Sequence, residues 1–256
     1  MSEIREESNL EEYFLKLIHG EACMFKLIKI EREKNQIAGY GIKAVISMAI
    51  IFVLVAGMAL MSNAQDEPMF YNFTDFMSLA NIFIRITFVV FSGILISRLV
   101  IEEYKGKTMQ LLFTYPLQRK KIIQAKLMIV LGFCFTSIVI TTLLIEGMTV
   151  LLNPQLHFFE TSATMTDLLA TVPSILIASA MTAGLSLISL FFGMRKKSTA
   201  AAITSSVIIG TLSNAMVSDG SSSVNMFQFI VIPAILCLLG LTVAYLSYRK
   251  IDRIDI

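Results

Sequence analysis

The sequence of 256 residues contains no tryptophan, and it has only two histidines and three cysteines. The cysteines, Cys23, Cys134 and Cys237, lie far apart and form no CxxC pair, so neither a disulfide framework nor a cysteine metal site is predicted. His19 and His157 are similarly distant from each other, which argues against a histidine metal site. A GxxxxGK[ST] phosphate loop is also missing, so we expect no nucleotide hydrolysis by this chain itself.

Charge is scarce as well. Charged residues make up 16% of the chain and hydrophobic residues 55%, and the mean hydropathy is +0.73. These values are typical of an integral membrane protein and not of a soluble domain. The net charge of +2 is too small to suggest a nucleic-acid partner. No cleavable signal peptide is expected, because the first 40 residues are rich in charge and the first apolar run is long enough to span.

Six apolar stretches approach the roughly 20 residues that a membrane-spanning helix requires. The predicted fold is therefore an all-α integral membrane protein with six transmembrane helices. We expect cytoplasmic amphipathic helices over residues 1–43, a six-span domain over 44–248 and a cytoplasmic tail over 249–256. The predicted spans run over Ala44–Met61, Asn81–Ile101, Leu127–Leu144, Leu168–Phe192, Thr199–Met216 and Met226–Tyr248.

The distribution of cations predicts the orientation. Of 21 Lys and Arg residues, seven precede the first span, seven lie at 98–126, three at 195–197 and three in the tail, which leaves only Arg85. Because Lys and Arg near the ends of spans are retained in the cytoplasm, both termini are predicted to be cytoplasmic.

Before the first span, Leu10, Tyr13, Phe14, Leu17 and Ile18 recur at helical spacing, with several lysines beside them. This pattern favours an amphipathic helix lying in the inner headgroup region. The alternative is an ordinary helix packed on another subunit.

Apart from the cations at the cytoplasmic ends of the spans, two ionisable residues are candidates for a role within the membrane: Arg85 in the second span and Glu146 just beyond the third. Counted from the outer ends, both are expected in the outer parts of their helices. One interpretation is that each side chain extends to the headgroups. The other is an Arg85–Glu146 ion pair that closes the outer end of a pathway.

The segment 102–121, EEYKGKTMQLLFTYPLQRKK, joins the second and third predicted spans. Gly106 permits a turn, and Thr108 is suited to cap a short helix that Pro116 would end. Its apolar residues would then be exposed at the cytoplasmic surface, where such a patch usually marks a contact site. The alternative is that they fold back onto the headgroups. The exposed apolar residues are Leu111, Leu112 and Phe113.

This segment resembles the coupling segment of ABC-2 type transporter permeases. The shared pattern is an acidic residue, Gly-x-Thr, a Leu-Leu pair, Thr-x-Pro, an Arg three residues after the proline, and a Lys at the start of the next span. The six-span layout, the amphipathic N-terminal helix and the basic tail are similar too, so the resemblance covers nearly the whole chain. The matching residues are Glu102 or Glu103, Gly106, Thr108, Leu111, Leu112, Thr114, Pro116, Arg119 and Lys126.

The resemblance implies a permease that pairs with a second permease chain, identical or different, and with two separate ATPase subunits, which would hold the ATP and Mg. It implies no catalytic residue, metal or cofactor in this chain, and a multi-pass location in a bacterial cell membrane. Glu102, Glu103, Gly106, Thr108, Leu111, Leu112, Phe113, Pro116 and Arg119 would then form the ATPase-docking site.

The connection between the last two predicted spans, VSDGSSSVN, departs from many family members, because it is too short for re-entrant helices. This departure favours the compact class that resembles permeases for bacteriocin, bacitracin or other amphipathic-peptide export and immunity. The resemblance leaves open both the compound and whether it is exported or extracted from the outer leaflet. Two other functions remain open: a non-transporting sensor or assembly protein that binds an ATPase, and a channel or secondary carrier.

Overall fold

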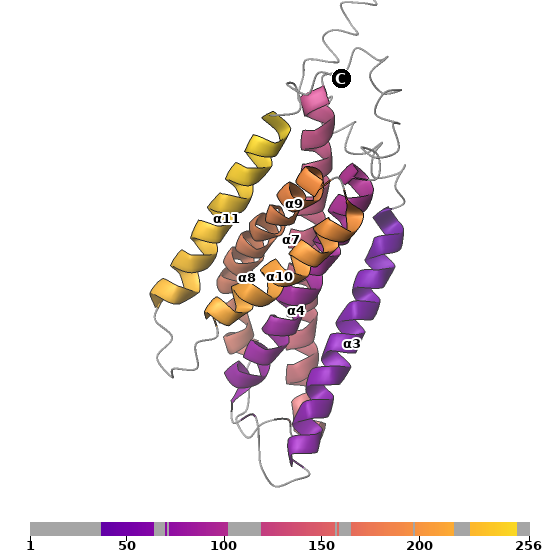
Figure 1. Ribbon diagram of the computed structural model, residues 1–256. Helices are drawn as coiled ribbons and strands as arrows, with labels where there is room; N and C mark the ends of the chain where they lie inside the picture. The colour runs from indigo at the N-terminus through magenta and orange to yellow at the C-terminus, as the bar shows by residue number, and fades with distance from the viewer. Residues whose placement is uncertain are drawn as a thin grey trace, which may run out of the picture.

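The computed structural model describes residues 37–63, 70, 72–101, 119–156, 158, 165–196, 198–217 and 226–249. Within these ranges the chain forms helices and no strands, in agreement with the predicted all-α class. The elements are α3 (Ile37–Asn63), α4 (Phe73–Ile96), the π-helical turn η1 (Ser97–Ile101), α7 (Arg119–Leu156), α8 (Met165–Ser186), α9 (Ile188–Lys196), α10 (Thr199–Val217) and α11 (Met226–Arg249) (Figure 1).

The helices run up and down a single bundle, with α4 at its centre (Figure 1). Helix α4 contacts α3, α7, α8 and α10, whereas α11 packs on α8 and α9. The bundle has two ends. We call the one where α3 stops and α4 begins the Phe73 end, and the opposite one, where η1 stops, the Ile101 end.

Among the described residues, four stretches are long and apolar enough to cross a membrane: Gly39–Ser62, Phe73–Ile101, Ile123–Leu156 and Thr171–Lys196. Helices α10 and α11 coincide in sequence with the fifth and sixth predicted spans. The described apolar part of α11, Ala234–Val243, is shorter than the four stretches above. The structure thus supports a multi-pass membrane protein, and the count of six spans stays a prediction.

Helix α4 begins eight residues before the predicted start of the second span at Asn81. Asn72 is its N-cap, with an extended backbone but no side-chain capping hydrogen bond, and Asp75 in the first turn suits the positive end of the helix dipole. The backbone N–H of Asp75 donates to the carbonyl of Asn72 at 3.2 Å. The helix therefore begins in a segment that contains polar residues, ahead of the predicted span.

The predicted fourth span is divided into two helices. A turn at Leu187 separates α8 from α9. There the N–H of Leu187 donates to the carbonyl of Gly184 at 3.2 Å, and the N–H of Leu190 donates to the carbonyl of Leu187 at 3.1 Å. These i to i−3 bonds tighten the backbone locally, as in a 3₁₀ turn.

Apolar side chains form two buried clusters, one toward each end of the bundle. Toward the Phe73 end, the Phe76 ring lies 5.5 Å from that of Phe70 and 5.6 Å from that of Phe158. Toward the Ile101 end, the cluster joins η1 to α7, α9 and α10. The outer surface carries many large apolar side chains, for example Ile42 and Val53 of α3. An apolar surface of this kind suits contact with lipid.

Candidate functional site

The predicted ATPase-docking residues lie almost entirely outside the described residues, as does the predicted N-terminal amphipathic helix. Of the docking residues, only Arg119 falls within them, as the first residue of α7. The roles assigned to the others therefore stay predictions. The structure does describe the two helices on which the segment 102–118 is mounted, η1 before it and α7 after it.

The turn η1 is an unusual end for a membrane helix. Its backbone is π-helical over Ser97–Ile101, and its side chains are buried except that of Arg98, which is exposed. A π-helix bonds each N–H to the carbonyl five residues earlier instead of four, and short π segments occur frequently at functional sites. The backbone is therefore locally widened directly before the predicted coupling segment.

Lys126 of α7 supports this turn. Its side chain is only 1% exposed, and its Nζ donates a hydrogen bond of 2.9 Å to the backbone carbonyl of Leu99. A buried ammonium is costly unless it is hydrogen-bonded, and so is a carbonyl removed from the regular helical pattern. The bond gives each group a hydrogen-bond partner. It also ties α7 to η1 across the base of the predicted coupling segment.

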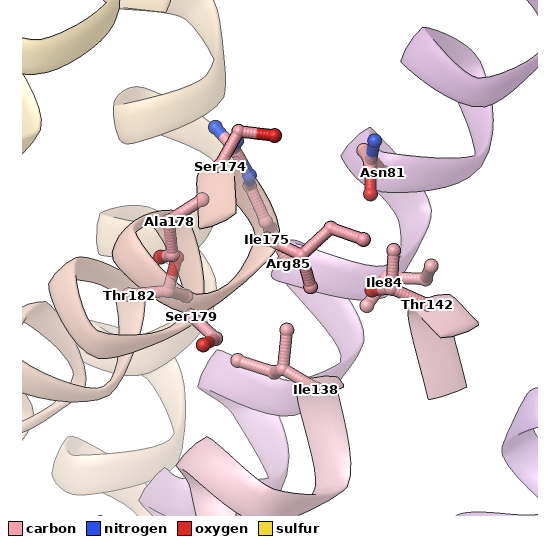
Figure 2. Close-up of a pocket in the computed structure, with 10 residues that line it drawn as sticks. All are labelled: Asn81, Ile84, Arg85, Ile138, Thr142, Ser174, Ile175, Ala178, Ser179 and Thr182. Carbon is pink, nitrogen blue, oxygen red and sulfur yellow. The ribbon is translucent and has the colours of Figure 1, made fainter. Parts of the chain in front are cut away.

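A polar pocket lies deeper in the bundle, between α4, α7 and α8 (Figure 2). Its cavity volume, counted as the space that the centre of a water molecule can reach, is about 50 Å³. Since one buried water needs about 10–15 Å³ of such space, the pocket has room for a few waters or a small polar group, but not for a peptide. It is lined by Asn81, Ile84, Arg85, Ile138, Thr142, Ser174, Ile175, Ala178, Ser179 and Thr182.

The hydroxyl groups on the α8 side of this pocket already donate to their own helix. Ser174 bonds the carbonyl of Thr171 at 2.7 Å, Ser179 that of Leu176 at 2.9 Å and Thr182 that of Ala178 at 2.7 Å. Each hydroxyl oxygen therefore keeps lone pairs that can accept hydrogen bonds. Acceptor oxygens of this kind can solvate a guanidinium, either directly or through water.

Arg85 is the cation in this pocket, and Figure 2 shows its side chain extending from α4 toward α8 near Ser174. It lies about 18 Å along the helix from Phe73, at 1.5 Å per residue. This position is close to the middle of the 29-residue stretch Phe73–Ile101. Because α4 begins well before Asn81, Arg85 lies deeper in its helix than the predicted span placed it, although it is still nearer the Phe73 end than the Ile101 end.

Glu146 lies one turn from the pocket residue Thr142 on α7 and is 3% exposed. Its Oε2 accepts a hydrogen bond of 3.2 Å from the hydroxyl of Thr171 on α8. The carbonyl of Thr171 in turn accepts from Ser174, which lines the pocket. The structure thus places both Arg85 and Glu146 beside the same polar region, and their ion pair stays a prediction.

Sequence reasoning singled out Lys126 only as a match to the family pattern, and it missed the bond to Leu99. The one signal was a lysine directly before the apolar run that begins at Leu127. The hydroxyl residues of α8 were visible in the sequence, but the pocket depends on which helices face one another. Among the described residues, no group of three or more His, Cys, Asp or Glu side chains could hold a metal ion.

The fold and the site define an integral membrane protein with apolar helices around a small polar interior. A family profile described as "ABC-2 family transporter protein" matches residues 27–214, and the chain belongs to this family. A relative from Bacillus subtilis (strain 168), "Uncharacterized protein YcbO", is 34% identical over 229 residues, which cover 90% of this chain and 99% of the relative. No solved structure matches the chain significantly.

Family membership confirms the resemblance seen in the sequence. Membrane subunits of this family are not themselves ATPases, and membership implies an ATPase partner in an ABC transporter.

Proposed function

We propose that this chain is the permease subunit of an ABC exporter. Two separate cytoplasmic ATPase subunits would dock on the segment 102–121, and a second permease chain would complete the pathway. The ATP and Mg would be held by the ATPase subunits. The exported compound would be a peptide, an antibiotic or another amphipathic molecule, and the protein would act in the cell membrane, in antibiotic resistance or immunity.

The observation that carries this proposal is the family match over residues 27–214, which spans the proposed docking segment. The structure adds support at the base of that segment. Lys126 is buried and bonded to Leu99, so the two helices that lead into and out of the segment are joined. Because the segment is connected to two helices that contact each other, a movement of the segment caused by a bound ATPase would displace both helices.

The substrate class is inferred from the sequence and from the size of the polar pocket. The connection between α10 and α11 is short and polar in sequence, which leaves little room for an external collar. The polar pocket described above is too small for a peptide. A larger substrate would therefore have to pass along a surface of the bundle, most simply between two permease chains.

The proposal is tested by expressing the chain with a Walker-motif ATPase from the same genome and purifying the complex through a tag on the permease. We expect the ATPase to co-purify and to hydrolyse ATP. Replacing both Leu111 and Leu112 by Asp should reduce the affinity of the permease for the ATPase by about a hundredfold or more. The reason is that the loss of two buried apolar contacts costs about 3–4 kcal/mol of binding free energy.

The control is Gln110→Asp, which adds one negative charge, half that of the double variant, to a polar position of the same segment. It should leave the complex intact. If the double Asp variant binds and hydrolyses ATP like the wild type, the docking assignment is wrong. If an ATPase binds but no candidate peptide or antibiotic stimulates hydrolysis or is transported, the non-transporting sensor is the better function.

A further inference from the structure

We propose that Lys126 is a positioning residue that transmits movement of the coupling segment into the bundle. By holding η1 against α7, it makes the two ends of the segment move together. The movement then passes from Ile101 to the α9–α10 corner, which we define as residues 193–202. This inference rests on the proposed function, because it assumes an ATPase that moves the segment.

The first joint is the bond between Lys126 Nζ and the carbonyl of Leu99, at 2.9 Å. It connects two residues that are 27 positions apart in sequence and lie on either side of the segment. Leu99 belongs to the π-helical turn, whose backbone departs from the regular α-helical bonding pattern. A single side-chain donor therefore binds the part of α4–η1 whose backbone departs from the α-helical pattern.

The second joint is the contact of η1 with the α9–α10 corner. Gly193 of α9 is so close to its neighbours that a Cβ there would overlap Cδ1 of Ile101 and lie 2.8 Å from Cβ of Ala202. Ile101 and Ala202 are 2% and 0% exposed, so little empty space separates the three residues. A displacement of Ile101 would thus have to displace the corner.

The corner itself is held together by backbone bonds. The N–H of Ser198 donates to the carbonyl of Gly193 at 3.3 Å, and the N–H of Ala202 donates to the carbonyl of Ser198 at 3.4 Å. Helix α10 leaves this corner and packs along α4, where Gly93 meets Ser206. Movement at Ile101 would therefore shift α10 relative to α4.

The test uses hydrogen–deuterium exchange on the isolated full chain and on its complex with the ATPase, before and after addition of ATP, Mg and vanadate. In the isolated chain, Lys126→Met should speed exchange of the amides of residues 97–101 by about tenfold, since it removes a hydrogen bond from a charged donor. In the complex, nucleotide should change exchange at 193–202 in the wild type but not in Lys126→Met.

Two variants separate this role from a merely structural one. Lys126→Arg keeps a charged donor and should restore both results. Arg98→Met removes an exposed cation from the same turn and should behave like the wild type. If Lys126→Met does not fold, Ile101→Ala tests the contact of η1 with the α9–α10 corner, because it removes the side chain that meets Gly193 and should reduce the nucleotide effect at 193–202 while the bond between Lys126 and Leu99 is kept.

Several outcomes would overturn the inference. One is unchanged exchange at 97–101 in Lys126→Met, and another is a nucleotide effect at 193–202 that survives in this variant. A wild-type complex that hydrolyses ATP without any change at 193–202 would equally exclude the proposed route. If no ATPase binds the wild type, the proposed function is wrong. Hydrogen–deuterium exchange at 97–101 in the isolated chain still shows whether Lys126 stabilises η1.

Discussion

The hydroxyl of Thr171 donates a hydrogen bond of 3.2 Å to Oε2 of Glu146 and so joins α8 to α7 inside the bundle. Glu146 is 3% exposed in this arrangement. A buried carboxyl group is costly unless it is hydrogen-bonded, so this contact constrains how the two helices pack. It lies one turn from the polar pocket on both helices, since Thr142 and Ser174 line that pocket.

Replacing Thr171 by Val should therefore destabilise the fold, because Val fills a similar volume but offers no donor to Glu146. We expect a loss of about 1–2 kcal/mol in the free energy of unfolding, as an interhelical bond to a buried carboxyl is removed. Unfolding by SDS, followed by circular dichroism, measures this loss.

Thr136→Val is the matched control, because Thr136 is exposed and its hydroxyl bonds the carbonyl of Gly132 in its own helix. The control should stay within about 0.5 kcal/mol of the wild type. Thr171→Ser keeps the donor and should recover most of the stability. Equal stabilities of the Thr171→Val and Thr136→Val variants would show that the interhelical bond contributes nothing.

The predicted Arg85–Glu146 pair is tested by exchanging the two charges. Arg85 lines the pocket and Glu146 lies one turn from it, so a shared interaction is geometrically reasonable. If the two groups pair, the double variant Arg85→Glu, Glu146→Arg should be more stable than either single variant, with a coupling energy of about 1–2 kcal/mol. The same SDS unfolding assay measures all three proteins.

Combining Glu146→Arg with Arg98→Glu serves as the control, because Arg98 is exposed on η1, far along the same helix. That combination should show no rescue. A double exchange no better than the single variants would remove the ion-pair hypothesis, and the polar pocket would then serve to solvate Arg85 alone.

The sequence predicted the class of fold because membrane helices depend mainly on composition. The family, too, was recognisable from a short pattern of residues around Gly106 and Pro116, and the family profile confirms it. The helix bounds were predicted less well. Helix α4 begins at its cap, Asn72, and α7 extends over 38 residues, far beyond the apolar run Leu127–Leu144. A helix can continue beyond the roughly 20 residues that a membrane core requires, so the length of a span does not determine where the helix ends.

Other features depend on contacts between distant residues, so one sequence could not reveal them. The π-helical backbone of η1 lies within an ordinary apolar run, SRLVI. Its partner Lys126 was visible as a lysine but not as a donor to Leu99. The turn at Leu187 contains no proline that would have predicted it. Conversely, Pro173 lies within α8 and does not divide that helix. Each of these features arises from packing in three dimensions.

The contact between Gly240 and Gly184 gives a prediction about helix packing. A Cβ on Gly240 of α11 would overlap the backbone carbonyl of Gly184 on α8. Because a backbone cannot move aside as a flexible side chain does, Gly240→Ala should cost about 1–3 kcal/mol in the free energy of unfolding. Gly132→Ala is the control, since nothing lies within 4 Å of a Cβ there. It should be neutral or stabilising by up to about 1 kcal/mol, because Ala favours the helix.

Opposite signs for these two substitutions would establish that α8 and α11 pack backbone to backbone. If Gly240→Ala is as stable as Gly132→Ala, then α11 does not approach α8 as closely in the membrane as the structure places it.

The orientation of the bundle is the last prediction. Nearly all cations flank the Ile101 end, so this end should face the cytoplasm and the Phe73 end the exterior. Two exposed positions report on the two ends: Lys196 at the end of α9 and Gln155 near the end of α7. Each is replaced by Cys in a chain whose native cysteines, Cys23, Cys134 and Cys237, are changed to Ala.

A membrane-impermeant maleimide added to whole cells should then label Gln155→Cys and leave Lys196→Cys unlabelled until the cells are opened. In inverted vesicles the pattern should reverse. Labelling of Lys196→Cys in intact cells would place the Ile101 end outside, and with it the segment 102–121. A cytoplasmic ATPase could not reach the segment there, so this one result would contradict the orientation and the proposed docking site together.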